Sequence, residues 1–392
     1  MGALDGIRVV EAGLLVQGPQ AAATLGEWGA DVIKVELPGF GDQSRWIPAQ
    51  ATDPRPPYFI ACNRGKRSIT IDLRLPDGRE LFLQLAERAD VIITNFKPGT
   101  MEAWGLGYDD VAARSPGVVY AAGSTFGTLG PDAHREGADL AGQAAGGLIS
   151  TTGLLGGDPT PVGATIADHT ASQNLLSGIL AALVARHRTG RGQRIDTSLV
   201  GGQIWAQASE YTRCILAGSP AGPANQGSAL IPGVYAIFPT ADGWIAIVGV
   251  AGPARDVFYA LIGRPELSKR FPQLLYWNDE KRELWPILNE AFATRTTAEW
   301  CELLAAAGLR HAPVRDHAQV LADQAMWDNG YFATVQGPDG PVAAVRAPVR
   351  FSDTPAGPEA LPPELGQHTE EILLELGRSW DDINALRDAG VV

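Results

Sequence analysis

The chain has 392 residues, of which 45% are hydrophobic, and a formal net charge of −13. This length predicts two or three domains, and the acidic balance argues against nucleic-acid binding, which needs a basic surface. The three cysteines are far apart, so neither a disulfide framework nor a zinc spacing is present. Without a signal-peptide pattern or a run of ~18 apolar residues, we expect a cytoplasmic protein that does not contact membranes.

The first part of the chain predicts an open α/β domain. A strand at 7–11, a helix at 19–28 and a strand at 32–36 form a strand–helix–strand unit, which implies a parallel sheet. Further strands are predicted at 68–73, 91–95 and 118–122, with a helix at 78–88. Ligands of such sheets bind outside the carboxyl ends of the strands.

A lone carboxylate, Asp168, precedes an apolar run whose spacing predicts a helix over about 173–186. Asp168 would then lie in or near the first turn, where backbone N–H groups and the helix dipole favour an anion. A carboxylate kept ionised there is a candidate nucleophile. The simpler alternative is that Asp168 is only the N-cap of the helix.

The second part of the chain predicts a smaller α+β domain after a stretch rich in Gly and Pro at 218–233. An Asp-Gly turn between 234–239 and 244–248 predicts a β-hairpin. Helices follow at about 254–263, 281–294 and 297–307, then a hairpin from 331–335 and 342–349, and short helices at 368–377 and 379–389.

Three short motifs are ambiguous on their own. The loop from Gly13 lacks G-x-G-x-x-G, and Pro19 removes one amide from a phosphate-binding nest, which argues against NAD. The segment 95–99 follows a strand and could hold a nucleotide base and phosphate, or form a plain turn. The segment 249–253 would allow a close backbone approach to a ligand, or simply lead into a helix. The histidines are scattered, so no metal is expected.

Taken together, several segments resemble the class III coenzyme A transferases, the family of formyl-CoA transferase and carnitine CoA-transferase. The matching stretches are 4–9, 29–36, 41–45, 63–69, 95–99, 143–153, 189–193 and 365–369. The resemblance implies a Rossmann-like large domain with a parallel sheet, built from 1–224 and 326–392, and a small α+β domain at 225–325. It also implies a homodimer of two interlocked, ring-like subunits.

The resemblance also implies an activity: coenzyme A passes from an acyl-CoA donor to a carboxylic acid acceptor through an aspartyl anhydride and an aspartyl-CoA thioester. The nucleophile falls on Asp168, and neither a metal nor NAD is needed. The expected coenzyme A contacts are Gln17, Arg74, Asn95, Phe96 and Lys97, and the expected glycine loop over the site includes Gly249 and Gly252.

Two departures from the family pattern matter. Some transferases carry a basic residue that contacts a coenzyme A phosphate, and its position falls near Ala103 in this chain. Arg45, Arg135 or Lys97 would have to replace that contact. The His-Asp pair of the related racemases reads Ala138-Asp139, which favours a transferase, because a racemase needs a base on each face of the α-carbon. Asp139 would remain as a carboxylate that steers Asp168. The alternatives left open are an acyl-CoA racemase or isomerase, a nicotinamide oxidoreductase and a non-catalytic acyl-CoA-binding protein.

Overall fold

The computed structural model describes residues 2–224, 227–272, 279–337, 340–355, 357 and 360–392. The chain divides into two compact units. The first contains Met1–Gly142, Thr165–Gln203 and Gln324–Val392, and the second contains Gln143–Ala164 and Ile204–Asp323.

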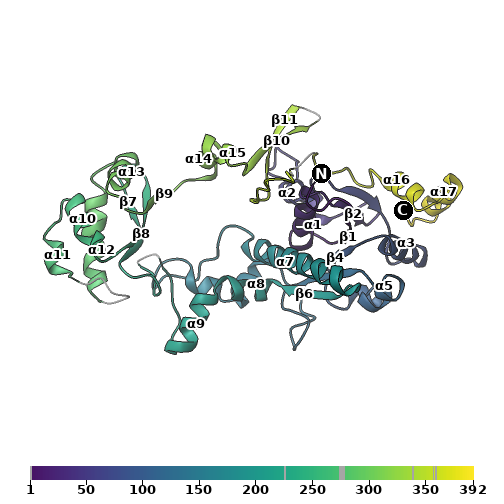
Figure 1. Cartoon of the computed structure of the whole chain (residues 1–392), viewed down its shortest axis with the longest axis horizontal. Coiled ribbons are helices and arrows are strands. Elements are labelled where there is room, and N and C mark those ends of the chain that lie inside the picture. Colours follow the sequence, from purple (N-terminus) through teal and green to yellow (C-terminus); the bar gives the residue numbers. More distant parts are fainter. Residues whose placement is uncertain (1, 225–226, 273–278, 338–339, 356, 358–359) are drawn as a thin grey trace. The chain divides into compact units, whose positions relative to one another are not determined.

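The first unit is built on a six-stranded parallel sheet of order β3-β2-β1-β4-β5-β6 (Figure 1). Its strands are β1 (Arg8–Ala12), β2 (Asp31–Glu36), β3 (Arg67–Thr70), β4 (Val91–Thr94), β5 (Val119–Ser124) and β6 (Arg194–Ser198). The parallel pairing confirms the predicted α/β class. We did not predict β6, because this partly exposed edge strand has a single apolar residue, Ile195, and so lacks the apolar run of a central strand.

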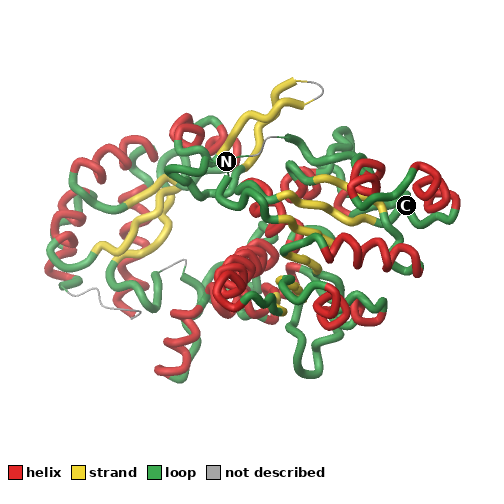
Figure 2. Tube along the Cα trace, turned by 45° about the vertical axis from the view of Figure 1, so that its right-hand side comes forward, coloured by secondary structure: helices red, strands yellow, loops and turns green. Residues whose placement is uncertain are grey.

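Helices cover both faces of this sheet (Figure 2). On one face α1 (Gln17–Glu27) and α7 (Ile166–Thr189) pack against β1, β4 and β5. On the other face α3 (Pro76–Glu87), α5 (Tyr108–Arg114), α16 (Thr369–Glu375) and α17 (Trp380–Asp388) share one core with the sheet. The remaining helices assigned wholly or mainly to this unit are α2 (Pro57–Asn63), α4 (Thr100–Ala103), α6 (Asp139–Ala145), α8 (Leu199–Ala206) and α15 (Gln324–Asp328).

The C-terminal segment closes the free edge of β3. The N–H of His368 donates to the carbonyl of Ser68 at 2.9 Å, and the N–H of Thr70 donates to the Thr369 hydroxyl at 3.2 Å. These contacts satisfy part of the polar edge that β3 would otherwise expose. The segment follows the hairpin of β10 (Phe332–Gly337) and β11 (Gly340–Val345).

The second unit has a three-stranded antiparallel sheet of β7 (Val234–Pro239), β8 (Trp244–Val250) and β9 (His311–Pro313). The expected Asp-Gly hairpin is confirmed, since the Thr240 N–H donates to the Gly243 carbonyl at 2.9 Å. Its helices are α9 (Ala208–Ala217), α10 (Ala254–Leu261), α11 (Leu267–Arg270), α12 (Asp279–Phe292), α13 (Thr297–Ala306) and α14 (His317–Leu321). Phe238, Phe258, Phe292 and Trp300 form the aromatic centre of its core.

This unit includes two segments that the expected boundary at 225 assigned to the large domain, 143–164 and 204–224. The side chain of Gln207 donates to the carbonyl of Gly146 at 2.9 Å, and the hydroxyl of Tyr211 donates to the same oxygen at 3.2 Å. These contacts join segments far apart in sequence, which no local composition signal reveals. None of the described helices is long and apolar enough to cross a membrane.

Candidate active site

Asp168 is the third residue of α7 and lies in its first turn. The helix begins at Ile166, earlier than predicted, and its N-cap residue is Thr165. The alternative that Asp168 is the N-cap is therefore wrong. Its carboxylate has no hydrogen-bond or ion-pair partner among the residues that the structure describes.

The side chain that caps α7 belongs to Asp139, the first residue of α6. Its Oδ1 accepts hydrogen bonds from the N–H groups of Ala167 at 2.7 Å and Asp168 at 3.2 Å. An oxygen that satisfies free N–H groups of the first turn is a helix cap by its chemistry. Asp139 therefore contacts the backbone of the candidate nucleophile.

Burial, with repulsion from Asp139, raises the pKa of Asp168 to about 7. We expected the helix N-terminus to keep this group ionised. The raised pKa reflects two influences that act against ionisation, the loss of hydration and the negative charge of Asp139. A more basic carboxylate is also a stronger nucleophile once it is ionised.

Two side chains of α1 face the same region of the unit. The Gln20 side-chain oxygen contacts Nδ1 of His169, the residue next to Asp168. Gln17 is buried, and its amide donates to the carbonyl of Ser124 at 3.4 Å. A Cβ at Gly123 would lie 2.4 Å from the Gln17 side chain, so only glycine leaves room for this glutamine.

A pocket of about 260 Å³ lies at the carboxyl ends of β1, β2 and β3, where parallel sheets bind ligands. It is lined by Gly13, Leu14, Val35, Glu36, Leu37, Phe40, Gly41, Asp42, Gln43, Ile71, Asp72, Leu73, Arg74, Phe96 and Trp104. The rings of Phe96 and Trp104 meet edge to face with centroids 5.6 Å apart. The Arg74 side chain is 62% exposed and pairs with Asp72 at 2.7 Å, so a stronger anion could draw it away from that partner.

Asn95, a predicted coenzyme A contact, is committed to the protein backbone. Its side-chain oxygen accepts from the Leu14 N–H at 2.7 Å, and its amide donates to the Leu14 carbonyl at 2.8 Å. The side chain therefore holds the loop between β1 and α1. The structure gives this residue a role that the sequence did not indicate.

The basic residues differ in how accessible they are. Lys97 is 45% exposed and lies 3.9 Å from Glu136. Arg135 pairs with Asp132 at 2.9 Å and covers the ring of Phe126. Both could exchange these exposed partners for a phosphate group.

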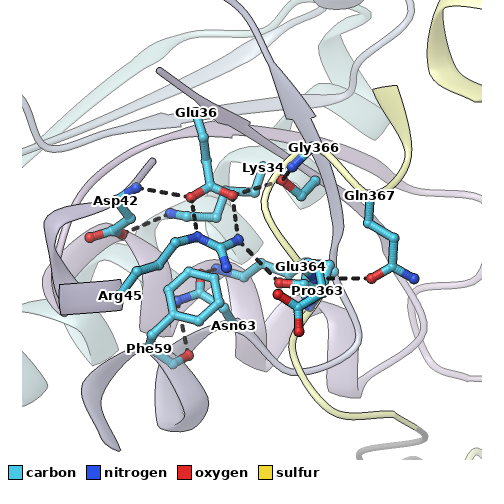
Figure 3. Close-up of polar contacts among 12 residues, drawn as sticks. Lys34, Glu36, Asp42, Arg45, Phe59, Asn63, Pro363, Glu364, Gly366 and Gln367 are labelled. Carbon is cyan, nitrogen blue, oxygen red and sulfur yellow. Dashed lines mark hydrogen bonds and ion pairs between the residues drawn. The ribbon is translucent and has the colours of Figure 1, made fainter. Parts of the chain in front are cut away.

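Arg45, in contrast, is held inside the protein (Figure 3). Its guanidinium donates two hydrogen bonds to Glu36, at 2.8 and 2.7 Å, and one to the carbonyl of Pro363. It also lies 3.7 Å from the centroid of the Phe59 ring. These contacts remove it from the residues available to replace a basic side chain at Ala103. They also occupy Glu36, the carboxylate that a dinucleotide fold would use for ribose.

The glycines of the expected loop, Gly249 and Gly252, belong to the second unit. Both have left-handed φ angles, 65° and 56°, which a side chain would disfavour. Arg310 donates to the carbonyl of Gly249 at 3.3 Å. Glycine is therefore the residue that fits both positions of this loop.

Sequence reasoning missed a buried ionic cluster beneath the loop between β1 and α1. Its members are Glu11, Lys34, Asp42 and Lys66. The available signal was Lys34, a charged residue between the apolar Ile33 and Val35 in the middle of a strand. Among the described residues, no group of three or more His, Cys, Asp or Glu side chains could hold a metal ion.

The fold and this site combine an α/β scaffold, a partly buried carboxylate of raised pKa, and a pocket at the strand ends. Comparison with known protein families identifies the class. The model of the family described as "CoA-transferase family III" matches residues 4–369. The chain therefore belongs to CoA-transferase family III, and it is an enzyme of this class.

Named relatives span nearly the whole chain. It is 30% identical to the succinyl-CoA:glutarate CoA-transferase of Homo sapiens, covering 99% of this chain and 90% of that one. It is 34% identical to the succinyl-CoA:mesaconate CoA-transferase of Haloarcula hispanica, and the match covers 96% of this chain and 97% of that one. A crystal structure of a CAIB/BAIF family protein from Brucella suis superposes with a TM-score of 0.84 at 33% identity, covering 96% and 99%.

Proposed function

We propose that this enzyme transfers coenzyme A from an acyl-CoA donor to a carboxylic acid, with Asp168 as the nucleophile. The observation that carries the proposal is the Asp168 carboxylate: partly buried, without a partner among the described side chains, and raised in pKa to about 7. A carboxylate with no committed partner can attack an electrophile without first breaking a hydrogen bond or ion pair.

The reaction requires four balanced steps. The Asp168 carboxylate attacks the donor thioester carbonyl, which forms a mixed anhydride and releases coenzyme A thiolate. The thiolate attacks the aspartyl carbonyl, which forms an aspartyl thioester and releases the donor acid. The acceptor carboxylate attacks that thioester and forms a second anhydride with release of thiolate. The thiolate then attacks the acyl carbonyl of this anhydride. This step forms the new acyl-CoA and regenerates the Asp168 carboxylate.

Asp139 has two effects in this scheme. Its hydrogen bonds to the first turn of α7 fix the backbone from which the nucleophile projects. Its negative charge helps to keep the pKa of Asp168 high. Asp139 is thus a positioning residue that also tunes the basicity of the nucleophile.

The pocket at the strand ends is the candidate site for the nucleotide end of coenzyme A. Phe96 offers an aromatic face to the base, while Arg74, Lys97 and Arg135 are the exposed cations for its phosphates. Asn95 acts through the Leu14 backbone, and Gln17 forms the start of α1. Gly249 and Gly252 would supply the glycine loop that the family resemblance implies.

Three relatives support a substrate class. Their names pair succinyl-CoA with glutarate, mesaconate or D-citramalate, all of which are dicarboxylic acids. We therefore propose a dicarboxylyl-CoA donor, with succinyl-CoA as the first candidate, and a dicarboxylic acceptor.

We further propose the interlocked homodimer that the family resemblance implies. It is supported by large apolar side chains that the single chain leaves exposed, among them Trp205 at 72%, Ile215 at 80% and Leu216 at 82%. Exposed apolar patches of this kind mark protein interfaces. Sedimentation equilibrium of the wild type and of Leu216→Glu tests this: a monomeric wild type would contradict the dimer.

The activity is tested by incubation with succinyl-CoA, trapping with hydroxylamine or borohydride, and mass spectrometry of peptides. We expect modification only on the peptide that carries Asp168. Asp168→Ala should lose turnover while still binding coenzyme A. The matched control is Asp381→Asn, since Asp381 is also an acidic residue in a helix first turn but is exposed on α17; it should react normally. Appreciable turnover by Asp168→Ala would refute the assignment.

A further inference from the structure

The turn between β1 and α1 is held by buried side chains rather than by its own backbone hydrogen bonds. We infer that Lys34 and Asp42 are positioning residues that fix this turn, and with it one wall of the coenzyme A pocket. The inference rests on the proposed function, because it assigns these residues a role in binding that substrate.

Lys34 holds the beginning of the turn. Its Nζ donates to the carbonyl of Gly13 at 3.0 Å and to Glu11 at 2.9 Å. It also lies 3.0 Å from Oδ2 of Asp42, a contact that Figure 3 shows. All three charged side chains are fully buried. Lys34 thus donates hydrogen bonds to Gly13 and Glu11, and it forms an ion pair with Asp42.

Asp42 holds the next part of the turn. Its Oδ1 accepts the N–H of Leu15 at 3.1 Å, together with the N–H and hydroxyl of Ser44, each at 2.8 Å. Leu15 has a φ of 63°, and it is the only non-glycine residue with positive φ in the described part of the chain. This conformation costs on the order of 1 kcal/mol for a residue with a side chain, so the surroundings must maintain it.

Two further side chains complete the arrangement on either side. Asn95 holds both backbone groups of Leu14. Lys66 donates to the carbonyl of Pro19, in the first turn of α1, at 2.8 Å, and to Glu11 at 2.8 Å. The Lys34–Glu11–Lys66 chain therefore links both ends of the turn.

The position of the turn explains why this geometry matters for binding. Gly13, Leu14 and Asp42 all line the pocket. The turn leads into α1, whose Gln20 contacts His169 beside Asp168. Relaxation of Leu15 to an ordinary φ would move the pocket wall and the start of α1 together.

Energetics favour positioning over simple stabilisation. A buried ion pair often contributes no more to stability than well-packed apolar residues, because both charges lose their hydration. It does impose a defined geometry on its neighbours. Here those neighbours are the carbonyl of Gly13 and the N–H of Leu15, the two groups that bracket the turn.

The test compares Asp42→Ala and Asp42→Asn with Glu27→Gln. Glu27 is the matched control, because it is a buried, ion-paired carboxylate at the far end of α1. Two quantities are measured on each full-length protein: deuterium exchange of peptides that span 13–19, and affinity for coenzyme A by calorimetry. The kcat and KM of acyl transfer are then measured separately for each protein.

We expect both Asp42 variants to exchange faster at 13–19 by about tenfold, and to lose affinity for coenzyme A by about tenfold or more, mainly through KM. Glu27→Gln should stay within about twofold in both. If Asp42→Ala fails to fold, Asp42→Asn, which keeps the side-chain shape, gives the decision. Wild-type affinity in the Asp42 variant, or an equal loss in Glu27→Gln, would overturn the inference.

The outcome also separates this inference from the proposed function. If wild type does not bind coenzyme A, the proposed function fails. The deuterium-exchange data alone then test whether Asp42 fixes the turn. Unchanged exchange at 13–19 in the Asp42 variants would overturn the positioning role.

Discussion

At the scale of single residues, Asp168 is governed by opposing influences. The N-terminus of α7 favours its charge, while burial and Asp139 disfavour it and raise its pKa to about 7. The group is therefore partly protonated at neutral pH. This balance gives the proposed nucleophile a basicity that an exposed carboxylate lacks.

The rate of acyl transfer should rise with pH through about 7. Only the ionised Asp168 can attack, and its carboxyl group is protonated below its pKa. We expect kcat/KM for succinyl-CoA to fall about tenfold for each pH unit below 6. A pH–rate profile with a flat acid limb down to pH 5 would contradict the raised pKa.

Asp168→Asn should increase stability, and more so at high pH. The folded pKa is raised above the unfolded value, so the folded state binds the proton more tightly. Ionisation therefore destabilises the fold progressively as pH rises from about 4 to 7. At pH 8 the variant should gain on the order of 2–4 kcal/mol in the free energy of unfolding, and almost nothing at pH 3. Urea titrations at both pH values measure this difference.

At the scale of elements, the start of α7 depends on a side chain from another helix. The apolar periodicity predicted the body of α7 and placed Asp168 in or near its first turn, but it did not show that Asp139 from α6 caps that turn. The sequence distance between the two segments hid this contact. The same reason explains why the roles of Asn95 and Gln20 were not foreseen.

Asp139→Ala should destabilise the protein by about 1 kcal/mol, the usual effect of losing a helix cap. Asp139→Asn should retain an acceptor oxygen for the cap while losing the charge. Because that charge raises the pKa of Asp168, both variants should move the acid limb of the pH–rate profile to lower pH. An unchanged limb in Asp139→Asn would show that Asp139 has no electrostatic influence on the nucleophile.

At the scale of the whole molecule, the first unit is completed by the C-terminal part of the chain. Residues 366–369 pair with the edge of β3, and α16 contributes Ile372 and Leu373 to the core beneath the sheet. Segments from both ends of the chain therefore share one core. The pocket also depends on this closure, since Arg45 joins Glu36 to Pro363.

Ile372→Ala should lower the free energy of unfolding by about 2–5 kcal/mol, because the side chain is 1% exposed in that core. Leu374→Ala provides the control on the same helix, since Leu374 is 42% exposed; it should change stability by about 0.5 kcal/mol or less. Denaturant titration of both variants distinguishes them. Similar small effects would show that α16 is not part of the cooperative core.

The sequence by itself determined the parallel α/β class, the hairpin of the second unit and the family, because local periodicity, turn residues and recurring short motifs express them directly. Tertiary structure decided which side chains act together. Three features depend on residues far apart in the chain. They are the capping of α7 by Asp139, the raised pKa of Asp168 and the ionic cluster under the turn between β1 and α1. Desolvation and hydrogen bonding depend on three-dimensional neighbours, so no local pattern in the sequence records them.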